Sequence, residues 1–305
     1  MSENLKWDDD IGEILGEEKG YTQLTYNYKV YENSDSNPHN RWTFDGWQST
    51  NNFNNNSSDA TWSTLKGIKV SRDFIAYAHY KEEDARQIPT NIEYFDFIEN
   101  DSVESIYGIG IKIKEKYRKV LSGKITLPSK YHETYISLIG DFNDTINVED
   151  VYFLTDNQYR GITHNGFRMY YDSKLTNVYL PKTEYFIYLG NYSFANCTNL
   201  KKIDMEETNL LNDFITNIGD YCFGIASAIN ANITKTNMQV NVHNLPSHLK
   251  YLGAGAFYGG VGIGNPNIHI DTLPNNLLKL STYCLRNCPK VNIREFGSNQ
   301  EGYGL

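Results

Sequence analysis

One short motif recurs along the second half of this 305-residue chain. It consists of an apolar residue, a glycine, three variable residues and an aromatic residue. Its copies are "LGNYSF" (189–194), "IGDYCF" (218–223), "LGAGAF" (252–257) and the degenerate "LSTYCL" (280–285). With "ITHNGF" (162–167) added, the closing residues are 27, 29, 34 and 28 positions apart. A regular period of about 20 to 50 residues indicates structural repeats that stack on one another.

Two more motifs follow the same period. "LP" occurs at 127–128, 180–181, 245–246 and 273–274, and a cysteine begins both "CTNLKKIDM" (197–205) and "CPKVNIREF" (288–296). The alternation in "LKKIDM" predicts a short strand with one buried face. The glycine of the first motif predicts a tight turn with positive φ. Proline disfavours a helix immediately before it, so "LP" predicts the start of the next repeat.

A single repeat of this kind cannot bury its apolar residues, but a stack can. We therefore expect a shared core made of Phe167, Leu189, Phe194, Leu200, Ile203, Ile218, Phe223, Leu252, Phe257, Leu280 and Leu285. The four cysteines lie in or just after repeats and form no CxxC pair. Because free cysteine is among the most buried residue types, we expect them to pack rather than to bind metal.

These motifs resemble the BspA-type leucine-rich repeat, whose consensus contains the run "IGxxAFxxCxxLxxIxLP". "LGAGAF" and "LGNYSFANCTNLKKIDM" match it closely, and the resemblance covers about residues 120–297. It implies a curved solenoid with a ladder of strands on one face. It also implies a binding or scaffold role, usually at a surface, and no catalytic residues.

The amino-terminal part has a different pattern. "YTQLTYNYKVY" (21–31) and "GIKVSRDFIAYAHY" (67–80) alternate as strands do, and "FDGW" lies between them at 44–47. This part, about 21–83, resembles the internalin-type B repeat, or Listeria–Bacteroides repeat, which implies a small β-grasp-like sheet. The resemblance places in its core Phe44, Trp47, Val70, Ala78 and Tyr80. An alternative is that Trp42, Trp47 and Trp62 form a sugar-binding stack.

The sequence thus predicts a mainly β protein: an N-terminal β-grasp-like module followed by a short irregular leucine-rich-repeat solenoid. Residues 1–20 form an acidic arm and 21–83 the B-repeat module. Residues 84–119 connect the two parts and cap the solenoid, with "IEYFDFI" (92–98) as an edge strand. Residues 120–305 form the solenoid.

Several function classes are disfavoured by the composition. The net charge is −9 and the 28 Lys and Arg residues are scattered, which disfavours nucleic acid as a partner. No run approaches the roughly 20 apolar residues of a membrane span. No hydrolase, metalloprotease or phosphate-loop motif is present, and His243 and His248 are not brought together by any regular geometry. We expect no enzymatic activity, no cofactor and no metal.

The sequence therefore predicts a structural or binding protein. Two modules typical of adhesion, and a first segment without a signal-peptide pattern, favour a bacteriophage virion component in the tail, neck, baseplate or capsid decoration. The alternative is a cellular BspA-like surface protein that binds host matrix or other cells. The partners would be virion neighbours or a cell-surface receptor, within a symmetric multimer. The unpaired ends of the solenoid are candidate contact sites.

Overall fold

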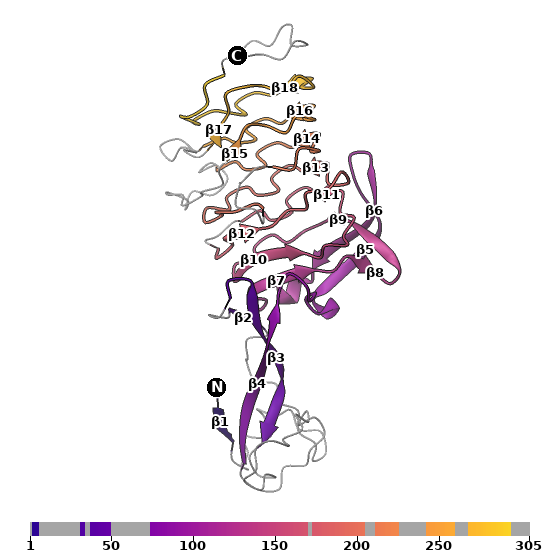
Figure 1. Ribbon diagram of the computed structural model, residues 1–305, viewed down its shortest axis with the longest axis vertical. Helices are drawn as coiled ribbons and strands as arrows, with labels where there is room; N and C mark the ends of the chain where they lie inside the picture. Colours follow the sequence, from indigo (N-terminus) through magenta and orange to yellow (C-terminus); the bar gives the residue numbers. More distant parts are fainter. Residues whose placement is uncertain are drawn as a thin grey trace. The chain divides into compact units, whose positions relative to one another are not determined.

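The computed structural model describes residues 2–5, 31–33, 37–49, 74–169, 173–204, 211–225, 242–259 and 268–293. The chain divides into two compact units, Met1–Asp84 and Ala85–Leu305. Figure 1 shows the second unit as a pile of thin coils whose strands lie one above another. The described residues contain two short 3-10 helices, η2 (Ile92–Tyr94) and η3 (Glu115–Tyr117), and no α-helix. The prediction of a mainly β fold is confirmed.

The first unit is a four-stranded antiparallel sheet of order β1-β4-β3-β2. Its strands are β1 (Ser2–Leu5), β2 (Tyr31–Asn33), β3 (Asn40–Ser49) and β4 (Phe74–Asp84). Strand β1 belongs to the segment predicted to be an arm, and it pairs along one edge of β4. The arm prediction therefore does not hold for these four residues.

Strands β3 and β4 pair in a register that joins Phe44 to Tyr80 and Trp47 to Ala78, with a shift between Phe44 and Gly46. The side chains of these four predicted core residues lie outside what the structure describes. Val70 and Trp62 lie outside the described residues altogether. Within the described part, the Arg41 guanidinium is buried and lies 3.5 Å from a carboxylate oxygen of Glu83 across the β3–β4 pair.

The main sheet of the second unit runs along the stack in the order β18-β16-β14-β13-β11-β9-β6-β5. From β6 to β18 all neighbours are parallel. Its strands are β5 (Phe95–Val103), β6 (Ile106–Ile113), β9 (Thr134–Ile139), β11 (Gly161–Ile162), β13 (Tyr188–Leu189), β14 (Asn217–Ile218), β16 (Tyr251–Leu252) and β18 (Lys279–Leu280), with β8 (Lys130–Tyr131) paired to β9.

Other strands of each coil form shorter parallel ladders. One has the order β12-β10-β7, and β15 pairs with β17 in another. These strands are β7 (Gly123–Leu127), β10 (Val148–Phe153), β12 (Asn177–Val178), β15 (Val242–His243) and β17 (Ile268–His269). Figure 1 shows β10 and β12 on one side of the coils and β11 to β18 of the main sheet on the other.

The short strand predicted at "LKKIDM" is not formed as a strand. Of its described residues, 200–204, only Lys202 forms a bridge, to Asn177 of β12. The main ladder instead uses the two residues before the motif glycine, as in β13 and β14. Each coil must turn several corners within about 30 residues, so pairing in the main ladder from β9 to β18 extends over only two residues. Leu200 and Ile203 are nevertheless buried.

A row of phenylalanine rings fills the centre of the stack. Successive ring centroids from Phe167 through Phe194 and Phe223 to Phe257 are 5.5, 5.1 and 5.5 Å apart, with interplanar angles of 10° or less. The row continues toward the amino-terminal end of the unit through Phe142, 5.4 Å from Phe167. All of these rings are fully buried. Burying a ring of this size contributes roughly 2 to 3 kcal/mol, so each coil depends on its neighbours.

The motif glycine does not have the positive φ that the sequence suggested. That conformation occurs two residues later, with φ of 60° at Tyr192 and 48° at Tyr221. A Cβ placed on Gly219 would lie 2.5 Å from the backbone nitrogen of Asn191 in the preceding coil. On Gly253 it would lie 2.4 Å from the backbone nitrogen of Asp220. Glycine is required here because the backbones of adjacent coils approach closely, not because of its φ.

The hairpin of β5 and β6 covers the first end of the stack. β5 is antiparallel to β6 and forms the outer edge of the main sheet. Phe95 of β5 packs 6.1 Å from Phe142 and is 2% exposed, so the hairpin caps the phenylalanine row. The sequence placed an edge strand at 92–98, but residues 92–94 form η2 and the strand begins at Phe95.

We predict that Gly219→Ala destabilises the solenoid by about 1 to 3 kcal/mol, because the added methyl group meets backbone rather than a flexible side chain. Urea unfolding followed by circular dichroism measures this loss. Gly224→Ala is the matched control, since its nearest atom would be 3.1 Å away and its loss is expected to be smaller. An equal or smaller loss for Gly219→Ala would contradict the close-approach explanation.

Candidate functional site

Four turns, each just before a strand of the main sheet, form a continuous row on the surface of the last coils. Each turn is closed by the same backbone hydrogen bond, from the amide of its fourth residue to the carbonyl of its first, at 3.0 to 3.2 Å. We call this set the turn row. It comprises 183–186, 212–215, 246–249 and 274–277. The fourth residue of each turn points into the core, as Phe186 and Leu249 show by their complete burial.

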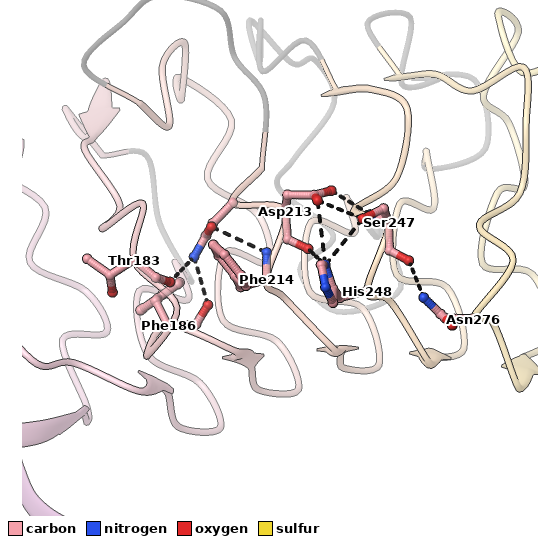
Figure 2. A network of polar contacts seen from close by, with 8 residues as sticks. Thr183, Phe186, Asp213, Phe214, Ser247, His248 and Asn276 are labelled. Atoms are coloured by element: carbon pink, nitrogen blue, oxygen red, sulfur yellow. Dashed lines mark hydrogen bonds and ion pairs between the residues drawn. The ribbon is translucent and has the colours of Figure 1, made fainter.

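Polar side chains join each turn to the preceding one, as Figure 2 shows. The Asn212 side-chain amide donates to the backbone carbonyls of Thr183 and Phe186 at 2.7 and 2.9 Å. The Ser247 backbone amide donates to Oδ1 of Asp213 at 2.6 Å. The Asn276 side-chain amide donates to the Ser247 backbone carbonyl at 2.9 Å. The four turns are therefore held in register by bonds that run along the stack.

The centre of the network contains Asp213, Ser247 and His248 (Figure 2). The Ser247 hydroxyl donates to Oδ2 of Asp213 at 2.6 Å. Nδ1 of His248 lies 3.0 Å from the Asp213 carbonyl, which can only accept, so Nδ1 carries the proton and donates. The side-chain and backbone donors of Ser247, together with His248, hold the pKa of the Asp213 carboxyl below its usual value.

This trio differs from a hydrolase triad. In a triad, serine and aspartate contact opposite ring nitrogens of the histidine. Here the Ser247 hydroxyl lies 3.2 Å from Nδ1, the same nitrogen that faces Asp213, and it donates directly to the aspartate. The arrangement orients the imidazole and ties two coils together. It does not prepare the hydroxyl for attack.

The third residue of the turn carries an exposed ring on three neighbouring coils. They are Tyr185 (47% exposed), Phe214 (42%) and His248. The rings of Phe214 and His248 stack with centroids 5.3 Å apart. Tyr251 of β16 and Leu278 are exposed close by in the chain, next to the cations Lys250 and Lys279. This surface offers aromatic and apolar contact with a few charges, a composition typical of protein recognition.

The structure brings nearly all of the predicted repeat residues into one core. Those 1% exposed or less are Phe167, Leu189, Phe194, Leu200, Ile203, Ile218, Phe223, Leu252 and Phe257. Leu280 and Leu285 are only half-buried, which corrects their assignment to the core. They belong to the last described coil, and no described coil lies beyond it to cover them.

The four cysteines are buried and free. Burial raises the pKa of the Cys284 thiol to about 11 and that of Cys288 to about 12. Cys197 and Cys288 donate to the carbonyls of Phe167 and Phe257 in the preceding coils, both at 3.1 Å. In the ranges that the structure describes, no three metal-ligating side chains form a cluster. His269 lies on β17 and is half-exposed, near Asp271.

Sequence reasoning missed the turn row and the role of the asparagines that bond one coil to the preceding coil. Asn199, Asn212, Asn276 and Asn287 all donate to backbone carbonyls 26 to 29 residues earlier, one coil back. The available signal was position: Asn276 follows "LP" by two residues, and Asn287 immediately precedes a repeat cysteine.

A comparison with known protein families agrees with this architecture. A family model described as "BspA type Leucine rich repeat region" matches in six copies, over residues 124–247 and 162–301. No curated protein matches the chain. The crystal structure of a leucine-rich repeat protein from T. pallidum (TpLRR) is similar with 15% sequence identity and a TM-score of 0.33, over 67% of this chain and 69% of that chain. In the described segments, no helix is both long and apolar enough to cross a membrane.

We predict that Ser247→Ala raises the pKa of Asp213 toward its ordinary value of 3.8, because the strongest of its hydrogen bonds is lost. An NMR titration of the carboxyl carbon measures it. Because the pKa of Asp213 is lower in the folded state than in the unfolded state, its carboxylate stabilises the fold at pH values above the ordinary carboxyl pKa. This contribution to stability is lost as the pH falls through the folded-state pKa, so the network weakens only in acid. Ser281→Ala is the control, because Ser281 follows β18 and lies outside the turn row. An unchanged Asp213 titration in Ser247→Ala would show that the hydroxyl is not its main partner.

Proposed function

The chain belongs to the BspA-type leucine-rich repeat family, and from this premise we propose that it is a non-enzymatic binding protein whose solenoid holds a protein partner against the turn row. Leucine-rich repeats typically mediate protein–protein interaction, and a solenoid offers an extended face rather than a single cleft. The partner would contact Tyr185, Phe214 and His248 together with Tyr251 on the adjacent strand.

The observation that carries this proposal is the combination of exposure and fixation in the turn row. Phe214 is 42% exposed, yet its ring stacks on His248 and its turn is bonded to the turns on both sides. A ring that is already held in place loses little conformational freedom when a partner covers it. Aromatic residues fixed in this way are the usual anchors of protein interfaces.

The polar groups of the turn row support a binding role over a catalytic one. The Asp213 carboxylate and the Ser247 hydroxyl satisfy each other, and the Asn212 and Asn276 amides are engaged by backbone carbonyls. Groups committed to joining coils are not poised to transfer a proton to a substrate.

For the first unit, we propose the internalin-type B repeat as the module closest in pattern. Strand β3 carries Phe44, Gly46 and Trp47, and its antiparallel partner β4 carries Ala78 and Tyr80. This order of motif and strand supports the resemblance. The module would then add a second adhesive element to the chain.

The location of this binding stays the prediction made from the sequence, a bacteriophage virion, with a cell surface as the alternative. A virion component is expected to remain with particles purified on a density gradient, at a fixed copy number measured by quantitative mass spectrometry. A cell-surface protein would instead be cleaved by protease added to intact cells. Loss of the chain during particle purification would reject the virion assignment.

We predict that a photo-crosslinking residue at Phe214 yields a discrete adduct with a partner protein in the native setting. The same residue at Tyr107, which is 67% exposed but lies in the β5–β6 hairpin, is the control. With the partner in hand, Phe214→Ala is expected to weaken binding about tenfold, as for an interface anchor, and Tyr107→Ala to leave it unchanged. Equal crosslinking at both positions would argue against the turn row as the binding surface.

A further inference from the structure

The last described coil (274–293) ends the parallel ladder with its hydrogen-bonding groups exposed. In the preceding coil, the carbonyls of Lys250 and Leu252 accept bonds from the last coil. The equivalent carbonyls in the last coil belong to Leu278 and Leu280, according to the register of β16 and β18. They accept no bond from any described residue. Two acceptors therefore face away from the stack.

The same coil also presents donors on that face. The amides of Gly255, Phe257 and Gly259 each donate to a carbonyl of the last coil, at 2.8 to 3.0 Å. Their equivalents, one repeat of 28 residues later, are the amides of Tyr283, Leu285 and Asn287. These amides have no acceptor among the described residues. The carbonyl acceptors at β18 and the amide donors in the turn that follows it together form a hydrogen-bonding edge. The preceding coils bind the next coil through the equivalent edge.

The side chains of this end are apolar and uncovered. Leu285 occupies the position of Phe257 in the central row but is half-buried, whereas Phe257 is fully buried. Leu278 is 55% exposed and Tyr283 is 61% exposed. The opposite end of the same row is covered by the β5–β6 hairpin through Phe95. Within the described residues, the solenoid thus has one covered end and one uncovered end, which we call the open end.

Charge distinguishes this end from the rest of the chain. Residues 274–293 contain three cations, Lys279, Arg286 and Lys290, and no aspartate or glutamate. All three are exposed. The whole chain carries a net charge of −9, so this concentration of positive charge is local. Two copies joined at this end would bring six cations together, which disfavours a symmetric end-to-end dimer.

We infer that the open end binds an acidic, extended segment of a partner protein, which adds the next coil to the ladder. The segment pairs its amides with the carbonyls of Leu278 and Leu280, and its carbonyls with the amides of Tyr283 and Leu285. Its apolar side chains cover Leu280 and Leu285, and its carboxylates lie near Lys279 and Arg286. This edge adjoins the turn row, because Leu278 and Lys279 lie next to both. Its unpaired backbone groups belong to the last coil alone, so the inference does not depend on the proposed function.

A synthetic peptide that copies residues 211–225 with Cys222→Ser tests the inference. It is part of one coil of this chain and contains two aspartates and no cation. Fluorescence anisotropy with the full chain is expected to detect binding that weakens as salt increases, because the ion pairs are exposed. The triple variant Lys279→Glu, Arg286→Glu, Lys290→Glu is expected to weaken it about tenfold or more. The matched triple variant Lys116→Glu, Lys119→Glu, Lys174→Glu, also at exposed cations, is expected to leave it unchanged.

N-methylated peptides separate edge pairing from charge attraction without altering the protein. In the native coil the amides of Thr216 and Gly219 donate to the preceding coil. Methylating these two amides is expected to abolish binding, whereas methylating Ile218 is expected to preserve it. Equal binding of both peptides would overturn the inference, because charge alone would then hold the peptide. Self-association of the chain that the peptide displaces would overturn it too, since the occupant would be a second copy.

Discussion

The structure depends on the stacking of thin coils, none of which has an interior of its own. Phe194 meets Phe167 on one side and Phe223 on the other, with near-parallel rings about one coil apart. The backbones approach so closely that Gly219 cannot carry a Cβ. Apolar burial and backbone pairing therefore act along the same direction, and removing either separates neighbouring coils.

A stack held in this way has two end coils, each of which lacks a neighbour on one side. At the first end, the β5–β6 hairpin pairs with the ladder and places Phe95 on the phenylalanine row. At the last described coil, leucine replaces phenylalanine in the row and remains half-buried. The difference between the ends gives the solenoid a direction. The β5–β6 hairpin completes one end, and the last described coil presents an unpaired strand edge with exposed cations.

The turn row shows how the same repetition builds a surface. Polar residues at different positions of the turns bond to the coil before them, as Asn212 does to Thr183 and Asn276 to Ser247. Those bonds fix the turns, and the fixed turns display rings such as Phe214. A surface built from repeats is therefore rigid without being part of a regular sheet. The exposed rings depend on the coil-to-coil bonds for their position.

The sequence by itself determined the period, the family and most of the core, because the residues that face the interior must be apolar in every copy. It did not locate Phe142 in the row, since "IGDF" is shorter than the motif by two residues. It also placed the ladder strands wrongly and gave the wrong reason for the motif glycine. Both depend on the distance between the backbones of adjacent coils, and the sequence of a single repeat does not show that distance. Only the tertiary structure decided which polar residues join coils and which rings reach the surface, because those roles are defined by neighbours about 28 residues away.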